Sequence, residues 1–227
     1  MDTTDTSTRS PLYPHKRLMH QQGQRHKSQR RQDQRRHKAA GPFLDLAAYL
    51  FLPGMSLLFV RGSNWLTTNL SVLGNDSGRQ NAFVFWGLFV GIYFFILLKK
   101  IAGHLPAPPR GTVFIPLSLL LLTCALTTPY LPKQFPFRSF LHVLFAFLSA
   151  VCLALFVALL VFSLYRRQPD RFFLYPVGLS SILSGCILLF LAAGIISSAL
   201  EIFFVLSLSL LCRTLEKKLA QTKRPGR

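Results

Sequence analysis

Residues 64–76 read NWLTTNLSVLGND, and they form the one long polar, non-repetitive connection in a chain that is almost entirely apolar after residue 42. Apolar runs lie on both sides of this connection. They approach the roughly 20 residues that a helix needs to cross about 30 Å of hydrocarbon. A polar connection between two such runs indicates a loop at a membrane surface. The stretch and its surroundings therefore predict an all-α, polytopic membrane protein.

Composition and charge support this prediction. The chain has 227 residues, of which 51% are hydrophobic, and it carries 26 Lys and Arg against 8 Asp and Glu. A soluble domain this apolar would not also carry a net charge of +18. The charge lies in tails and short loops and the apolar residues lie in long runs, as in membrane proteins. The four cysteines fall in apolar runs without metal-site spacing, so we interpret them as buried hydrophobic residues.

The charge pattern divides the chain into three parts. Residues 1–41 are polar and strongly basic from His15 to Lys38, and no apolar periodicity indicates a core, so we expect a disordered cytoplasmic tail. Residues 42–212 form the predicted transmembrane domain, and residues 213–227 a basic cytoplasmic tail. Because neither interleaved aromatic residues nor a folded module is evident in the N-terminal tail, we expect no nucleic-acid binding. Anionic membrane lipid is the expected partner of the basic tails.

Six membrane helices are expected from the apolar runs. Their predicted ranges are 43–60, 81–98, 112–130, 138–165, 172–193 and 199–212. The last two share a run of 41 residues, too long for one crossing. A turn is expected at residues 193–198, where Gly194 can end one helix and Ser197 or Ser198 can cap the next. Pro53 predicts a kink in the first helix, because proline removes a backbone hydrogen bond.

Two charged or amphipathic features flank these spans. Asp45 lies near the basic end of the first span, where we expect it to pair with Lys38 or to lie at a helix N-terminus. Leu215 and Leu219 follow the sixth span and predict an amphipathic extension along the membrane interface.

The distribution of Lys and Arg predicts the orientation. With six spans and a cytoplasmic N-terminus, 22 of the 26 Lys and Arg fall in cytoplasmic segments and 4 in outer segments. This asymmetry is typical of membrane proteins with positively charged inner loops. The sequence therefore predicts a six-transmembrane-helix bundle with both termini cytoplasmic. We expect it in the cell membrane, as a multi-pass protein of a prokaryotic plasma membrane.

Small residues predict close helix packing at two places. Gly87 and Gly91 have the GxxxG spacing that allows another helix to approach closely. Alanines at every fourth position form a stripe in the fourth span, at Ala146, Ala150, Ala154 and Ala158. Either surface is a candidate interface for a homo-oligomer.

A candidate polar pocket lies on the predicted outer side. It combines residues of the quoted connection with one residue from each of two spans: Asn69, Ser71, Gly74, Asn75, His142 and Glu201. Polar groups at a membrane are costly and therefore informative. Glu201 is either a favourable charge at a helix N-terminus or a partner for His142, Asn69 or Asn75. We expect the connection to fold as a short cap, with a turn at Gly74 and Asn side chains bonded to the backbone.

Known catalytic and cofactor-binding patterns are not recognisable. His142 is either a satisfied buried histidine or a ligand or proton carrier, and one His with one Glu does not make a zinc site. Haem would need a second inward histidine. The sequence shows no Ser-His-Asp set, P-loop or glycine-rich phosphate-binding loop. We therefore predict no catalytic, cofactor-binding or metal residues, and the sequence favours a protein that is not an enzyme.

Three short motifs resemble a known family. Residues 69–75, NLSVLGN, resemble the S-x-LG(N) signature after the first helix of a six-helix bacterial and archaeal membrane family of unknown function, the DUF family numbered nine-nine-eight. Pro136 followed by His142 resembles that family's Pro…His entry to helix four. Gly194 followed by Glu201 resembles its Gly…Glu entry to helix six. The resemblance covers about residues 43–212, and the family is similar in plan to the damage-regulated autophagy modulator group.

The chain departs from the family pattern at two positions. Val72 and Arg138 stand where the family commonly has acidic residues. Both departures remove negative charge from the outer side, which argues against a role in cation or proton transfer. The resemblance implies the six-helix plan, but the family brings no established activity.

Three functions remain open from the sequence. The first is binding of a lipid or small amphiphile in the outward-facing polar pocket. The second is a small transporter or channel subunit, although the predicted spans show no obvious inverted repeat. The third is a membrane enzyme that uses His142 as a base.

Overall fold

The computed structural model describes residues 41–75, 78–105 and 110–222. The predicted disorder of the N-terminal tail concerns residues outside this part of the chain, apart from Gly41, and so stays a prediction. Lys38, the expected partner of Asp45, lies outside it as well. The chain divides into two compact units, Met1–Phe43 and Leu44–Arg227. The description below concerns the second unit.

All regular structure in the described residues is helical. The first helical segment consists of η1 (Ala47–Phe51) and α2 (Leu52–Phe59), and the polar connection contains α3 (Leu70–Gly74). The remaining elements follow in chain order: α4 (Gln80–Gly103), α5 (Phe114–Thr127), α6 (Pro136–Arg167), α7 (Pro169–Phe172), α8 (Leu174–Ala193) and α9 (Ser198–Thr222). The prediction of an all-α fold is confirmed.

Five helices are long and apolar enough to cross a membrane. They are Gly41–Phe59, Gln80–Gly103, Pro136–Arg167, Leu174–Ala193 and Ser198–Thr222. α5 is shorter than its predicted range of 112–130. Its 14 residues rise about 21 Å at 1.5 Å per residue. The helix ends early because Thr128 precedes Pro129 and takes an extended backbone, with φ −97° and ψ 115°.

The predicted kink in the first helix takes the form of a π-helical turn. In η1 the Leu52 N–H bonds to the carbonyl of Ala47, five residues earlier, and Pro53 follows directly. Such wider turns often accompany a proline, because the ring cannot donate a hydrogen bond and clashes with the preceding turn.

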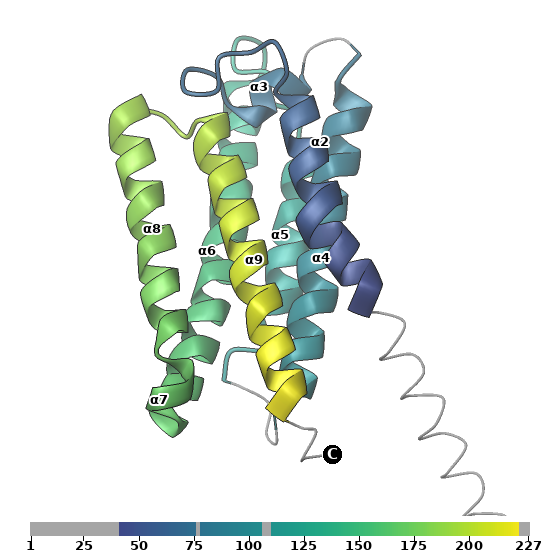
Figure 1. Ribbon diagram of the computed structural model, residues 1–227. Helices are drawn as coiled ribbons and strands as arrows, with labels where there is room; N and C mark the ends of the chain where they lie inside the picture. The colour runs from purple at the N-terminus through teal and green to yellow at the C-terminus, as the bar shows by residue number, and fades with distance from the viewer. Residues whose placement is uncertain (1–40, 76–77, 106–109, 223–227) are drawn as a thin grey trace, which may run out of the picture. The chain divides into compact units, whose positions relative to one another are not determined.

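The helices of the second unit pack around an apolar core. α5 packs along α6 and α4, and α9 packs against α4, α8 and η1. Every long helix contributes residues to the core. The contribution of α8 is small, because two of its 20 residues, Leu179 and Ile182, are buried. Figure 1 shows α3 beside the start of α9, while the C-terminal end of α9 lies at the opposite end of the helices. We call these ends of the second unit the α3 end and the C-terminal end.

Glycines permit two of the close approaches. A Cβ on Gly87 would lie 2.6 Å from the Leu126 side chain, and one on Gly91 would lie 2.8 Å from Leu119. The GxxxG surface of α4 is therefore filled by α5 of the same chain. Gly194 ends α8 with a left-handed backbone at φ 70°, and α9 starts at Ser198, as the sequence predicted.

Candidate functional site

The polar connection folds as a cap whose backbone is bonded to the first turn of α9. The backbone N–H of Ser198 donates to the Thr68 carbonyl at 2.8 Å, and that of Ala199 donates to the Trp65 carbonyl at 3.0 Å. The Ser198 hydroxyl also donates to the Thr68 carbonyl, at 2.7 Å. The first N–H groups of a helix lack partners within the helix, so the connection satisfies donors that α9 leaves open.

Asn69 begins α3 by capping it. Its side-chain Oδ1 accepts the backbone N–H of Val72 at 2.7 Å, which is the geometry of a helix N-cap. In the same connection, Asn64 Oδ1 accepts the N–H of Leu66 at 3.1 Å. The expectation that Asn side chains would satisfy backbone groups in a short ordered cap therefore matches the geometry.

Ser71 and His142 form a direct pair between the cap and α6. The Ser71 hydroxyl lies 2.7 Å from Nε2 of His142. His142 Nδ1 lies 2.8 Å from the carbonyl oxygens of Ala125 and Thr128, at the C-terminal end of α5. A carbonyl can only accept, so Nδ1 carries a proton, and in the neutral imidazole Nε2 then accepts from the Ser71 hydroxyl. His142 is 3% exposed and has partners at both ring nitrogens.

Glu201 also contacts the cap. Its Oε2 accepts the backbone N–H of Leu70 at 2.9 Å. Among the residues that the structure describes, no Lys, Arg or His pairs with this carboxylate, nor does it bond to Asn69 or Asn75. Glu201 is therefore a backbone acceptor within the first turns of α9, not the partner of His142 or of the asparagines.

Two predicted roles in the cap need correction. Gly74 is not a turn glycine with a positive φ: it is buried at the end of α3, and a Cβ there would lie 2.4 Å from Cγ of Phe83. Its small size is required by close packing. Asn75 is exposed, and within the described residues its side chain joins neither Ser71 nor Glu201.

Ser139 is a polar residue at this end that the sequence interpretation did not select. It lies one turn before His142 on α6, and it is 4% exposed. Its hydroxyl has no hydrogen-bond partner among the described residues. Buried polar groups are nearly always bonded, so this hydroxyl, on the turn that precedes His142, is an exception among the described residues.

A cavity lies between α4, α5, α6 and α9. Its volume is about 130 Å³ and its walls are mostly apolar, including Val90, Phe94 and Leu153. Glu201 is among its lining residues, as are Ser118 and Ser149. The two serines satisfy each other, because the Ser149 hydroxyl donates to the Ser118 carbonyl at 2.8 Å and the Ser118 hydroxyl to the Ser149 carbonyl at 3.0 Å. Glu201 therefore supplies the acidic group of this cavity.

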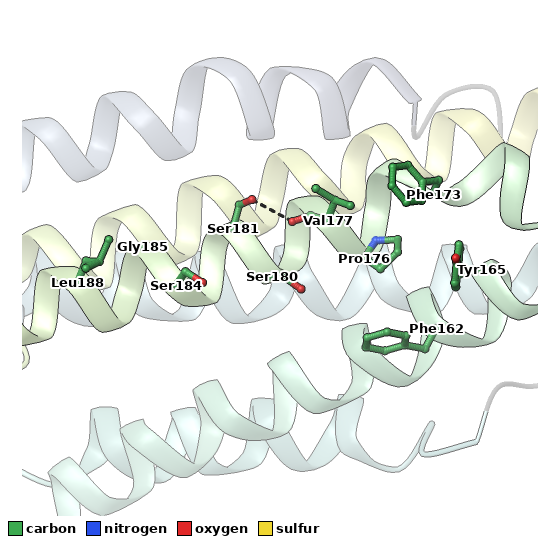
Figure 2. A pocket seen from close by; sticks show the side chains of 10 residues that line it. All are labelled: Phe162, Tyr165, Phe173, Pro176, Val177, Ser180, Ser181, Ser184, Gly185 and Leu188. Atoms are coloured by element: carbon green, nitrogen blue, oxygen red, sulfur yellow. Dashed lines mark hydrogen bonds between the residues drawn. The ribbon is translucent and has the colours of Figure 1, made fainter.

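A larger and more open groove lies between α6 and α8. Figure 2 shows its ten lining residues, which include Phe162 and Tyr165 from α6 and Ser180 and Ser184 from α8. The groove has a volume of about 680 Å³, and none of the predicted site residues lines it. Ser181 is another lining residue, and its hydroxyl donates to the Val177 carbonyl of its own helix at 3.0 Å.

A charged cluster at the C-terminal end was missed by the sequence interpretation. Glu216 accepts from Lys100 at 3.0 Å and from Arg213, and its carboxylate lies 3.6 Å from Nε2 of His104. Arg213 also bonds to Asp45 at 2.9 Å. Arg213 is 2% exposed and Glu216 is 3% exposed. The sequence contained one signal of this cluster: Arg213 and Glu216 carry opposite charges and lie one helical turn apart. They fall in the segment that was interpreted as a tail.

This cluster bears on two expectations. Asp45 pairs with Arg213 and with Lys217, at 2.6 Å from the Lys217 ammonium, so its described partners come from α9. The extension after Cys212 was expected to lie along the membrane interface, but it forms the last part of α9, which continues to Thr222, and its Leu215 and Leu219 are buried against the other helices. The extension packs inside the second unit because its charged residues find partners there.

Comparisons with known proteins identify no relative of the chain. No family model, curated protein or solved structure matches the chain. Within the described residues, no group of three or more His, Cys, Asp or Glu side chains could hold a metal ion. What the α3 end can do is therefore argued from its geometry.

Proposed function

We propose that the chain is a six-span integral membrane protein with both termini in the cytoplasm and the α3 end outside, in a plasma membrane. The support is the presence of five helices of crossing length, with α5 packed along α6 as the sixth. The concentration of Lys and Arg in the segments assigned to the inside supports the same orientation. Kinship with the six-helix family of unknown function is part of this proposal.

We propose further that the protein binds a small amphiphile in the cavity beside Glu201. The observation that carries this function is a carboxylate that lines an apolar cavity and has no described cationic partner. Glu201 is half-buried, and a carboxylate withdrawn from water is costly unless it is paired or well hydrogen-bonded. Its Oε2 accepts the Leu70 N–H, and its other oxygen is free to accept from a ligand. The ligand would carry a hydrogen-bond donor, best an ammonium, on an apolar body.

The size of the cavity restricts the ligand. An apolar cavity of about 150 Å³ can bind benzene. The cavity here, about 130 Å³, fits a body of similar size and excludes a complete lipid. Apolar walls with one charged group are typical of sites that orient a small molecule. Benzylamine is a suitable probe, because it joins a benzene ring to an ammonium group, and toluene is the matched probe without the donor.

The test is thermal unfolding of the full chain in mild detergent with each probe. We expect benzylamine to raise the unfolding temperature more than toluene does. In Glu201→Gln this advantage should disappear, while Ala150→Leu, which fills the cavity, should abolish the response to both probes. Thr127→Ala is the control, because the Thr127 hydroxyl bonds carbonyls of its own helix. An equal response to benzylamine in wild type and Glu201→Gln would contradict the proposal.

A further inference from the structure

The pair formed by Ser71 and His142 has the geometry of a nucleophile and its base. We propose that these two residues cleave an ester of an amphiphile at the α3 end, with Ser71 as the nucleophile and His142 as the general base. This inference rests on the proposed function to the extent that an amphiphile must reach this end of the protein. Neither residue is needed to bind a ligand at Glu201, so the two proposals can fail separately.

The protonation of His142 suits this role. Two carbonyl oxygens at 2.8 Å, from Ala125 and Thr128, hold the proton on Nδ1. In the neutral imidazole Nε2 is then the basic nitrogen, 2.7 Å from the Ser71 oxygen, within the distance expected between a nucleophile and its base. In serine hydrolases an acidic side chain fixes the same tautomer, whereas two main-chain carbonyls do so here.

His142 and Ser71 differ in how deeply they are buried. The imidazole is buried and lies beside two aromatic rings, with centroid distances of 5.6 Å to Tyr130 and 6.4 Å to Phe83. Ser71, in contrast, is only half-buried on α3. Because water is largely excluded from the imidazole, the electrostatic interactions that accompany proton transfer are stronger there than in water.

Ser139 supplies a candidate donor for the developing oxyanion. It lies three residues before His142 on α6, and residues at this spacing share one face of a helix. Its hydroxyl is buried without a partner among the described residues. An oxyanion that forms during ester cleavage needs such a donor, and donors of this kind commonly contribute about 100-fold to the rate.

The reaction balances without a further cofactor. The Ser71 oxygen bonds to the ester carbonyl carbon, and its proton moves to Nε2 of His142. The tetrahedral intermediate then expels the alcohol oxygen, which takes the proton from Nε2, and the acyl group stays on Ser71. Water attacks this acyl ester and gives its proton to Nε2. The carboxylic acid leaves as the proton returns to the Ser71 oxygen.

The experiment uses an alkyl fluorophosphonate on the full chain in detergent, followed by peptide mapping. A hydrogen bond that serves only stability would not give covalent labelling. We expect the label on Ser71, no label at this peptide in Ser71→Ala, and labelling at least about 100-fold slower in His142→Gln. Ser139→Ala should slow labelling without abolishing it. Ser63→Ala is the matched control, because its hydroxyl, in the same connection, donates to the Val60 carbonyl.

The outcomes separate the two proposals. Absence of label on Ser71 in the folded wild-type chain would overturn the reaction, whatever the variants do. Labelling of His142→Gln at the wild-type rate would overturn the role of the histidine. A chain that responds to benzylamine but is not labelled refutes the reaction alone. A chain that is labelled at Ser71 but does not respond to benzylamine refutes the cavity alone.

Discussion

Two glutamates of α9 have opposite environments. Glu216, at the C-terminal end, is 3% exposed and bonds to Lys100 and Arg213. Glu201 lies about 22 Å away along the same helix, at 1.5 Å per residue, and accepts a single described hydrogen bond, from the Leu70 backbone. The carboxylate of Glu216 finds its ion-pair partners within the chain. The carboxylate at the α3 end retains an oxygen for another partner, which is why we place the site there.

The difference shows how the same residue type serves two purposes. At the C-terminal end, each charge is matched by others from α4, α9 and the first helix, so removal of the buried Glu216 carboxylate takes an anionic partner from both Lys100 and Arg213. At the α3 end, the polar side chains bond mainly to backbone groups of the cap and of α5. Loss of one such bond costs less, because backbone groups near an end can be reached by water.

The largest expected effect is that of Glu216→Gln. The substitution leaves Arg213 and Lys100 without their shared carboxylate, so we expect it to lower the free energy of unfolding by about 3 kcal/mol. The measurement is unfolding by SDS in mixed micelles. Asp170→Asn is the control, because it removes an acidic charge from an exposed position on α7 and should change the stability by less than about 0.5 kcal/mol. If the two variants lowered the free energy of unfolding equally, the charged cluster at the C-terminal end would not differ energetically from an exposed charge.

An intermediate effect is expected from Gly74→Ala at the α3 end. The new Cβ would lie 2.4 Å from Phe83, so α3 or Phe83 must move, at a cost of about 2 kcal/mol. Gly54→Ala is the matched control. A Cβ at Gly54 meets nothing within 4 Å, so the alanine should stabilise α2 by up to about 1 kcal/mol. The same unfolding experiment measures both, and a neutral Gly74→Ala would show that the cap is not tightly packed on α4.

The smallest expected change in stability is that of Glu201→Gln. The amide oxygen of glutamine can still accept the Leu70 N–H, so the free energy of unfolding should fall by about 1 kcal/mol or less. Compared with Glu216→Gln, this variant makes the same chemical change on the same helix. If Glu201→Gln destabilised the chain as much as Glu216→Gln, Glu201 would be a structural residue with an additional partner.

The sequence predicted the helical elements better than their ends. Long apolar runs gave the helices, and Gly194 with Ser198 gave the turn between α8 and α9. The sixth span was predicted to end at Cys212 and to continue as an amphipathic extension along the membrane interface, whereas α9 runs unbroken to Thr222 with Leu215 and Leu219 buried. Charged residues after an apolar run normally indicate the end of a span, and only the partners of Arg213 and Glu216 explain why this helix continues.

Part of the candidate site was also accessible from the sequence. Asn69, Ser71, His142 and Glu201 were selected because polar residues near membrane spans are costly, and the structure brings them to the same cap. Ser139 was not selected, because a serine in a helix usually bonds to its own backbone. Asn75 was selected with its neighbours, but its side chain lies on the exposed side of the connection.

The sequence alone determined that this chain forms long helices, because a backbone in hydrocarbon must satisfy its hydrogen bonds within each segment. That requirement is local, and it can be read from a run of residues. The tertiary structure decided which polar groups meet. Ser71 and His142 are 71 residues apart, and Asp45 and Arg213 are 168 residues apart. Such pairings depend on how the helices pack and not on the composition of any one run, so the free carboxylate of Glu201 and the saturated one of Glu216 could be told apart only in the folded chain.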